Sequence, residues 1–562
     1  MIVQVTLLTC ISLVASAVTS NAQLPVEVVG TADFAGELEL ALRPRAITEL
    51  LAENSVSLTG FPCSDGTHVD LELVRLDSSR PGLGICVDGV RAWGLCEGLE
   101  LSVWYGRVAG DEDSEVALSF SQFGVTGWVR AGTRLDHLVT NCEGRIKLFS
   151  EAQRLAAGGN SGPFCASDAL NSITASPAQS STSAAPSSGN RSLYECAIAV
   201  ETDWQLFQVF GGNLQAQAAY VTSLLTWASY RFEQQIGTVL TYPYVQFYTT
   251  ANDPWHSQDI GGNCVDLLYE FQAAWAGSLP AGADLGHFLS GANLGCGAAF
   301  IGGLCDPLQH FGVTGNIDGN TQFPIQVGPS TFNFFGLCHE LGHNFNAIHT
   351  HDYCPPLDQC APPGYFGPCQ TQKVCTSQGT LMSYCHGCPG GMWNITTYFH
   401  SRSAADMRAF VEGGCLPLYC ADPAAYCTAK TNSLGCIPAI DWGGHPTLSG
   451  IDDFFVTASN VLNNKPGLLL RSMTPGAAPF AGGTLCLQPQ ILRTLAQGSG
   501  GTPAPAVDCS GSYLHHFSHA YMSALGLTPG TPVHVQFWSR DQGFPAPNNA
   551  GLTNALGFVI SQ

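Results

Sequence analysis

A Ser-, Ala-, Thr- and Pro-rich stretch about one third of the way along the chain limits how this sequence can fold. The stretch covers residues 167–191 and contains the run Ser-Ser-Thr-Ser-Ala-Ala-Pro-Ser-Ser at 180–188. Such a composition cannot bury a hydrophobic core, and it is typical of a flexible connector that proteases can reach. The 562-residue chain therefore has to fold as separate parts, and roughly three or four domains are expected at this length.

The first residues and the cysteines indicate export. Residues 1–22 combine a short apolar run, Val5 to Val18, with the small residues Ser20 and Ala22, which is the pattern of a cleaved signal peptide. The chain has 23 cysteines, and an oxidising compartment would turn most of them into disulfides. No later segment has the length and hydropathy of a transmembrane helix. The sequence predicts a secreted protein, either extracellular or at the cell surface.

The charge of the chain excludes one class of partner. The net charge is −22, from 21 basic and 43 acidic residues. Because no basic stripe is present, a nucleic-acid partner is not expected. The acidic excess is sufficiently explained by solubility.

The two outer parts of the chain have the alternation of β-strands. In residues 23–166, Val69, Leu71 and Leu73 point to one face of a predicted strand, which favours a β-rich N-terminal domain. Residues 419–562 contain a second alternating run around residues 533–538 and many Gly, Pro and Asn residues. This pattern predicts a β-sandwich-like module.

The middle part, residues 192–418, combines helical and strand patterns. Apolar residues at spacings of three and four predict one long helix from an N-cap at Asp203 to about Gln235. A strand at 238–248 and a second helix at 265–275 follow. Helices and strands alternate here, so a mixed α/β (α+β) domain is expected.

The residues most informative about chemistry lie within this mixed domain. His339 and His343 are four residues apart, so on a helix they share one face and can bind the same ion, with Glu340 beside them. His349 can join them only if the chain turns sharply after the helix. Asn346 is the residue expected at that turn, because Asn tolerates positive φ better than most residues.

Three imidazoles and a water molecule would form a tetrahedral zinc centre with one exchangeable position, as catalytic zinc sites have. Zinc lowers the pKa of its water to about 7, and Glu340 is predicted to accept the proton as general base and to pass it to the leaving amine. One catalytic Zn²⁺ is therefore expected. Nothing in the sequence indicates Ca²⁺, and calcium binding is left open.

The segment from His339 to His349 resembles the metzincin consensus HExxHxxGxxH, and His-Glu-Leu-Gly-His-Asn-Phe is most similar to the adamalysin/reprolysin branch of zinc metallopeptidases. Two positions depart from that pattern. Asn346 replaces the usual Gly, and Thr350 replaces the Asp that usually follows the third histidine. The resemblance covers about residues 194–418 and implies the metzincin fold for this region.

Further matches imply roles for other residues. Gly379 to Tyr384 resembles the Met-turn, in which Met382 would form an apolar floor below the histidines. Tyr384 follows that Met at the spacing of the astacin and serralysin branches, which implies an oxyanion-stabilising or fifth-ligand role. The segment with Gly295, Gly297 and Ala298 resembles the edge strand that pairs with extended substrate through its backbone.

Cys165 precedes the connector and has two interpretations. Residues 23–190 contain five cysteines, an odd number, whereas the presumed catalytic domain contains twelve. A lone thiol at Cys165 would occupy the open position of the metal, and the resemblance to metzincin zymogens makes it a candidate cysteine switch. The alternative is an interdomain disulfide, because the C-terminal part also has an odd number of cysteines, five.

These expectations combine into one leading function and two alternatives. The leading hypothesis is a secreted zinc endopeptidase, made as a zymogen, whose partners are protein or peptide substrates. The first alternative is a catalytically silent adhesion or binding protein on a metzincin scaffold, against which the intact Glu340 argues. The second is a structural zinc- or calcium-stabilised surface protein. The C-terminal module resembles modules appended to many secreted bacterial proteins, and its expected role is either binding to a cell surface or carbohydrate or recognition by a sorting system.

Overall fold

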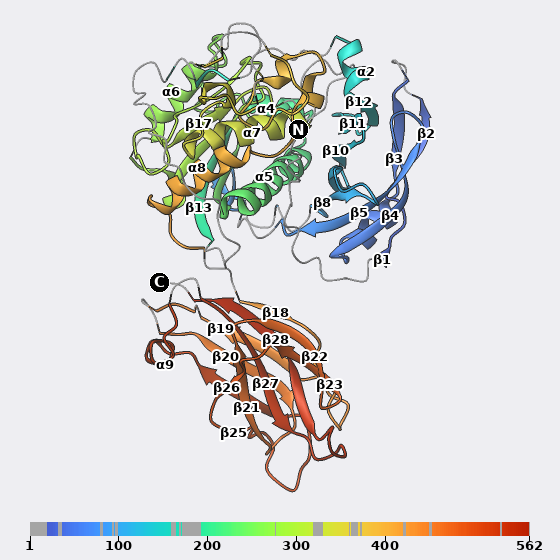
Figure 1. Ribbon diagram of the computed structural model, residues 1–562, viewed down its shortest axis with the longest axis vertical. Helices are drawn as coiled ribbons and strands as arrows, with labels where there is room; N and C mark the ends of the chain where they lie inside the picture. The colour runs from blue at the N-terminus through green and yellow to red at the C-terminus, as the bar shows by residue number, and fades with distance from the viewer. Residues whose placement is uncertain are drawn as a thin grey trace, which may run out of the picture. The chain divides into compact units, whose positions relative to one another are not determined.

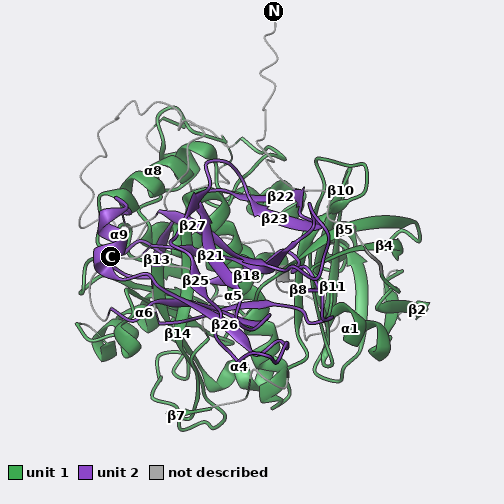
Figure 2. Ribbon diagram, turned by 90° about the horizontal axis from the view of Figure 1, so that it is seen from below, with its two compact units in different colours: residues 1–187, 196–416 green, residues 188–195, 417–562 purple. Residues whose placement is uncertain are grey.

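The structure is a computed structural model. It describes residues 20–31, 36–78, 83–92, 95, 99–158, 165–167, 170, 193–275, 277–317, 330–358, 360, 369–370, 374–419, 423–444, 446–448, 452–528 and 531–560. Residues 1–19 of the predicted signal peptide and most of the predicted connector lie outside the described residues, whereas residues 20–22 of the predicted signal peptide are described. The chain forms two compact units, residues 1–187 with 196–416 and residues 188–195 with 417–562 (Figure 2).

The N-terminal region, residues 20–158, is built around a ten-stranded sheet with the order β1-β4-β5-β8-β9-β10-β11-β12-β3-β2. Leu71 and Leu73 are buried in its core and Val69 packs against them, which confirms the predicted alternation. Two short helices, α1 (Pro44–Leu50) and α2 (Glu151–Ala156), accompany the sheet. The strands are β1 Ser20–Asn21, β2 Val26–Thr31, β3 Leu38–Leu42, β4 Ser55–Pro62, β5 His68–Leu76, β8 Ser102–Val108, β9 Glu115–Ser121, β10 Gly124–Ala131, β11 Arg134–Thr140 and β12 Ile146–Ser150.

The middle region contains a seven-stranded sheet with the order β16-β17-β15-β13-β14-β6-β7. Its last two strands come from the N-terminal region, and β6 pairs in parallel with β14 through Cys86 and Gln246. The two regions therefore share a sheet and belong to one compact unit, an arrangement that the sequence did not predict. The strands are β6 Ile85–Val87, β7 Val90–Arg91, β13 Tyr194–Thr202, β14 Thr238–Phe247, β15 Leu285–Leu289, β16 Gly297–Ala299 and β17 Phe311–Thr314.

Helices pack on this sheet, and α5 lies between it and the N-terminal sheet (Figure 1). The helix predicted from Asp203 to about Gln235 is in fact two helices, because Gly211 and Gly212 have φ values of 62° and 78° and end the first of them. Asp203 caps the first helix as expected and accepts a hydrogen bond from the Leu206 amide at 2.9 Å. The helices are α4 Trp204–Val209, α5 Leu214–Ile236, α6 Cys264–Trp275, α7 Ser330–Asn344 and α8 Ser401–Glu412, with short 3₁₀ helices η1 Pro280–Gly282, η2 Thr350–Asp352, η3 Cys385–Gly387 and η4 Gly391–Asn394.

Disulfides fix the loops around α7 and α8. Cys385 and Cys388, which have the spacing of a redox pair, are instead bonded to Cys360 and Cys375. They are structural crosslinks, as expected of cysteines in an exported chain. The remaining bridges of the middle region are Cys264–Cys296, Cys305–Cys415 and Cys354–Cys369.

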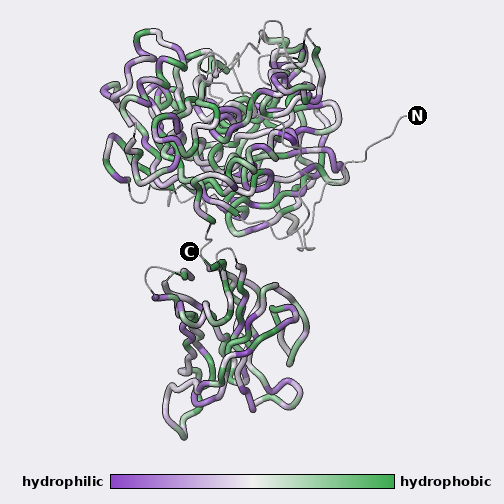
Figure 3. The backbone as a smooth tube through the Cα atoms, turned by 60° about the vertical axis from the view of Figure 1, so that its left-hand side comes forward, coloured by the Kyte–Doolittle hydropathy of each residue, from purple (hydrophilic) through white to green (hydrophobic). Residues whose placement is uncertain are grey.

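The second unit is a sandwich of β-sheets around one core. A sheet with the order β18-β28-β27-β21-β24 and a sheet with the order β19-β20-β26 both contribute to that core, which includes Val456, Val533, Val535 and Phe537. Figure 3 shows hydrophobic and hydrophilic residues interspersed along the chain of this unit. The elements are β18 Ala424–Tyr426, β19 Ala439–Gly443, β20 Phe455–Val461, β21 Pro466–Ser472, β22 Pro475–Phe480, β23 Gly483–Leu487, β24 Leu492–Arg493, β25 Gln497–Gly498, β26 Gly511–His516, α9 His519–Ala524, β27 Pro532–Arg540 and β28 Ala550–Val559.

None of the helices in the described parts of the chain is long and apolar enough to cross a membrane.

Candidate metal centre and active site

Helix α7 carries the first two histidines on one buried face. Nδ1 of His339 donates to the carbonyl oxygen of Leu381 at 2.6 Å, and Nδ1 of His343 donates to that of Ala347 at 2.8 Å. These bonds fix both rings and leave each Nε2 as the nitrogen that can bind a metal. Burial lowers the pKa of His339 well below its usual range, and this favours the neutral imidazole that coordinates a metal.

The chain turns sharply after α7, as the sequence predicted. Asn346 has a φ of 72°, and the Ala347 amide donates to the Gly342 carbonyl at 2.9 Å. The turn brings His349 back, so that its Nε2 lies 3.1 Å from Nε2 of His343. The turn after α7 thus brings the third histidine to the other two.

Cys165 joins the three histidines at the same point. Its Sγ lies 3.3 Å from Nε2 of His343. The four possible ligand atoms, including that of His339, all lie within 4.8 Å of one another. Ligands around a tetrahedral zinc ion at about 2.0–2.3 Å are about 3.3–3.8 Å apart. The three imidazoles and the thiol therefore fit a zinc ion in both chemistry and spacing.

Cys165 has no disulfide partner in the part of the chain that the structure describes. The interdomain disulfide considered from the sequence is therefore not seen. Burial and the nearby Glu340 raise the pKa of the Cys165 thiol to about 11. A metal ion would reverse this preference, because thiols coordinate as thiolates.

Glu340 is fully buried next to the edge strand β16. A Cβ atom at Gly297 would lie 2.5 Å from Oε1 of Glu340, so only glycine allows this approach. The hydroxyl of Ser167 donates to Oε2 of Glu340 at 3.3 Å. The carboxylate of Glu340 thus extends from helix α7, which carries the first two histidines, to strand β16, on which substrate was expected to pair.

The segment around Cys165 runs along that edge strand. Cys165 pairs with Gly297 in parallel, and the Ala166 amide donates to the Gly297 carbonyl at 2.8 Å. The Ala299 amide donates to the Ser167 hydroxyl at 2.9 Å. Gly297 and Ala298, which were predicted to bind substrate, lie in β16, and Gly295 precedes it with a φ of 74°. The edge is occupied by the chain itself.

The first residues of the predicted connector are ordered by these contacts. Ser167 and Leu170 are both buried, and Leu170 belongs to a cluster with Trp255 and Phe288. The expectation of a flexible connector starting at residue 167 is therefore wrong for these two residues, because the edge strand and an apolar cluster hold them.

The residues of the predicted Met-turn pack against α7. Met382 is fully buried, and a Cβ at Gly342 would lie 2.6 Å from its Sδ. Glycine at position 342 of α7 therefore lets the Met382 side chain pack directly against the helix. The Tyr384 ring lies 4.6 Å from the His349 ring, and its hydroxyl donates to the Cys165 carbonyl at 3.2 Å.

Sequence reasoning missed two acidic residues that support the site. Oδ2 of Asp352 lies 3.5 Å from Nδ1 of His349, and Asp358 binds Thr380 of the Met-turn. The sequence did contain a signal for such residues. A histidine that binds a metal commonly donates its other ring N–H to a carboxylate, so an acidic residue shortly after a candidate ligand is a candidate partner.

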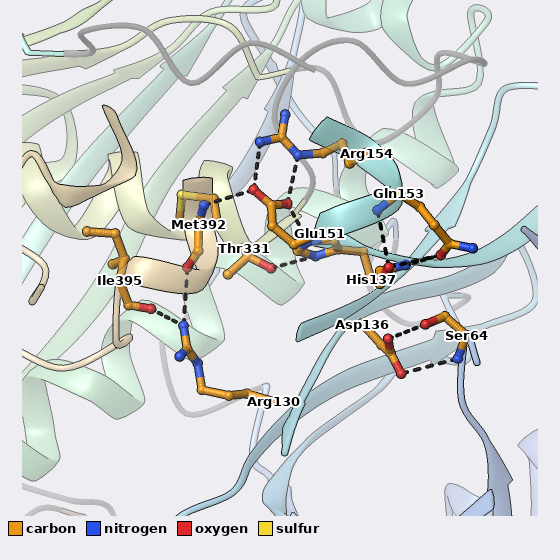
Figure 4. A network of polar contacts seen from close by, with 11 residues as sticks. Ser64, Arg130, Asp136, His137, Glu151, Gln153, Arg154, Thr331, Met392 and Ile395 are labelled. Carbon is orange, nitrogen blue, oxygen red and sulfur yellow. Dashed lines mark hydrogen bonds and ion pairs between the residues drawn. The ribbon is translucent and has the colours of Figure 1, made fainter. Parts of the chain in front are cut away.

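The N-terminal region holds the loop after the Met-turn with buried charges (Figure 4). The Arg130 guanidinium donates to the carbonyls of Met392 at 3.2 Å, Trp393 at 3.1 Å and Ile395. Glu151 accepts from the Met392 amide at 2.8 Å. These contacts join the two regions at main-chain groups.

A second buried contact joins the regions at helix α5. Glu115 of β9 lies 3.1 Å from Nη2 of Arg231, and both side chains are 3% exposed. Thr397 donates to the same carboxylate oxygen. Arg231, a buried cation of the middle region, thus has its carboxylate partner in the N-terminal region. Residues 192–418 contain only four basic residues in all, Arg231, Lys373, Arg402 and Arg408.

Comparison with known protein families agrees with this geometry. A reprolysin-type model described as metallo-peptidase family M12 matches residues 192–398. Among solved structures, metalloproteinase II from Bacteroides fragilis is similar with a TM-score of 0.34 and 11% sequence identity, over 63% of this chain and 90% of that one. No match was found among curated proteins. The family match includes all three histidines, and it supports a reprolysin-like metallopeptidase domain over residues 192–398.

Proposed function

We propose that this chain is the zymogen of a secreted zinc endopeptidase that cuts extended polypeptides. The observation that supports this most strongly is the convergence of His339, His343 and His349 next to Glu340, beside the edge strand β16. Seven disulfides among the described residues agree with an oxidising, extracellular location.

The residues around this point have distinct roles in the proposed reaction. Zinc held by the imidazoles would act as a Lewis acid toward the scissile carbonyl and would make water a better nucleophile. Glu340 accepts the proton of that water and delivers it to the leaving amine. Strand β16 binds the substrate backbone beside Glu340. Tyr384, which donates to the Cys165 carbonyl at 3.2 Å, donates to the reacting carbonyl oxygen of substrate in its place.

The N-terminal region acts as the prosegment in this proposal. Cys165 supplies a fourth ligand and excludes water from the metal, while Ala166 and Ser167 cover β16. The prosegment strand runs parallel to β16. Cleavage in the connector and release of the prosegment would open both the metal and the edge strand.

Metal content and proteolysis of the intact and the nicked chain test the proposal. We expect about one zinc per chain in both forms, with cleavage of a denatured protein substrate only after the connector is cut and the prosegment removed. Glu340→Ala should keep zinc and lose at least about a thousandfold in kcat, as general bases and their water contacts supply such factors.

The outcomes separate the candidate functions. Zinc without cleavage of any protein substrate, even after removal of the prosegment, would favour the silent binding protein. A Glu340→Ala variant that still cleaves would contradict the assignment of the general base. A chain without zinc would overturn the metallopeptidase mechanism altogether.

A further inference from the structure

Asp358 lies in the loop between the third histidine and the Met-turn, where its carboxylate binds Thr380. Oδ2 of Asp358 accepts from the Thr380 amide and from the Thr380 hydroxyl, both at 3.1 Å. Burial raises the pKa of Asp358, and the hydrogen bonds from Thr380 oppose that rise. The carboxylate therefore holds the start of the Met-turn, while the Thr350 hydroxyl donates to the Met382 carbonyl at 3.5 Å.

The two residues that follow Thr380 contact both sides of the metal centre. The Leu381 carbonyl accepts from Nδ1 of His339 at 2.6 Å. The Met382 carbonyl accepts from the Thr350 amide at 3.0 Å, directly after His349. Thus Asp358 holds Thr380. The next two residues, Leu381 and Met382, orient His339 and the turn that carries His349.

We propose that Asp358 is a positioning residue of the metal centre. By fixing Thr380 it sets the Leu381 and Met382 carbonyls, which in turn orient His339 and the turn at His349. Asp358 touches neither the metal ligands nor the reacting atoms. The inference rests on the proposed function to the extent that these histidines bind zinc.

The surrounding loop explains why a single side chain can act in this way. Two disulfides, Cys354–Cys369 and Cys360–Cys385, close the loop on either side of Asp358. The Leu357 amide also donates to the Thr350 carbonyl at 3.0 Å. The segment of Asp358 is therefore crosslinked on both sides where it contacts the Met-turn. Thr350 stands where the reprolysin-like pattern has Asp, and Asp358 brings a carboxylate to the same turn.

Zinc release from the full-length chain tests the inference. The zinc-loaded protein is mixed with a chelating dye, and the release rate is compared between wild type, Asp358→Ala and Asp358→Asn. We expect Asp358→Ala to release zinc about 10–100-fold faster, the usual cost of losing a partner of a ligand shell. Asp358→Asn keeps an acceptor oxygen and should show a smaller increase.

A matched control and a second readout distinguish positioning from general destabilisation. Asp284 is also half-buried and accepts a backbone hydrogen bond, from the Ala197 amide at 2.9 Å, but it directly precedes strand β15. Asp284→Asn should release zinc at the wild-type rate. In the cobalt-substituted chain, Asp358→Ala should change the visible spectrum of the metal, whereas Asp284→Asn should not. In the activated enzyme, Asp358→Ala should lower kcat with little change in KM.

The results also separate this inference from the proposed function. If Asp358→Ala does not fold, Thr380→Val removes one hydroxyl donor only, and it should raise the release rate in the same direction. Wild-type release rates and an unchanged cobalt spectrum in both variants would overturn the role of Asp358. A wild-type chain that holds no zinc would instead overturn the proposed function, and the positioning role with it.

Discussion

The sulfur of Cys165 lies 3.3 Å from Nε2 of His343, a spacing that suits two ligands of one metal ion. The backbone of the same cysteine pairs with Gly297 of the edge strand. One residue therefore covers the candidate metal-binding point and the start of strand β16 at once. If the chain is the zymogen proposed above, its latency has two separable components, the thiol and the paired backbone.

Replacing Cys165 with Ala should separate these components. The variant loses the proposed fourth ligand, so the intact chain should hydrolyse a short fluorogenic peptide at a measurable rate. The rate should stay below that of the activated enzyme, because the bond from the Ala166 amide to the Gly297 carbonyl remains. Cys142→Ala, at an exposed cysteine, is the matched control. An intact Cys165→Ala chain as inactive as wild type would show that the backbone alone maintains latency.

Glu115 should keep the prosegment attached after the connector is cut. Its carboxylate pairs with Arg231 in a fully buried contact, and removing one partner of such a pair costs about 3–5 kcal/mol. In nicked Glu115→Gln protein the prosegment should separate on size-exclusion chromatography under conditions where the nicked wild type stays associated. Arg402→Gln breaks a partly exposed pair with Asp406 and should change stability by less than about 1 kcal/mol. If nicked wild type and nicked Glu115→Gln retain the prosegment equally, this ion pair does not hold the prosegment in place.

The geometry of the histidines was predictable because it depends on local spacing. Two histidines four residues apart share a helix face in any helix, and the distance to His349 requires a turn at Asn346. The observed φ of 72° at Asn346 confirms that turn. The contact made by Cys165 could be predicted only as one of two alternatives, because an odd number of cysteines does not show what the thiol contacts.

The features that sequence reasoning missed depend on contacts between distant segments. The parallel pairing of β6 with β14 joins residues more than 150 positions apart, and nothing in the alternation of either strand selects its neighbour. The break between α4 and α5 had a local signal in Gly211 and Gly212, but the apolar spacing continued across it. Asp358 bonds Thr380 across a loop, and its role depends on where that loop closes.

A methyl group at Gly297 should abolish catalysis while leaving the metal in place. Its Cβ would lie 2.5 Å from Oε1 of Glu340, so the carboxylate must move away from the position of the water. Gly297→Ala should therefore lower kcat at least about a hundredfold, a loss typical of a displaced general base. Zinc content should remain at the wild-type level, because the atoms nearest to that Cβ all belong to Glu340 and none to a histidine.

Gly295→Ala provides the control for backbone strain near the same strand. Gly295 has a φ of 74°, and a Cβ added there would meet nothing within 4 Å, so alanine introduces strain without a clash. The substitution should cost about 1 kcal/mol of stability and leave kcat nearly unchanged. Similar kcat losses in both variants would show that strand distortion, and not the position of Glu340, is responsible.

Glu151 should make the stability of the chain sensitive to acid. Burial raises the pKa of its carboxyl, but hydrogen bonds from Arg154 and His137 outweigh burial and hold the pKa at about 2, below the usual 4.5. A carboxyl with a depressed folded-state pKa stabilises the protein fully above about pH 4.5, and this contribution is lost as the pH falls toward 2. The difference corresponds to about 3 kcal/mol at neutral pH.

In urea unfolding at a series of pH values, Glu151→Gln should be less stable than wild type at pH 7, and the gap should close between about pH 4.5 and 2. Glu143→Gln, at an exposed carboxylate paired with Arg145, should follow the wild type throughout, and a Glu151→Gln gap that is constant with pH would contradict the assignment.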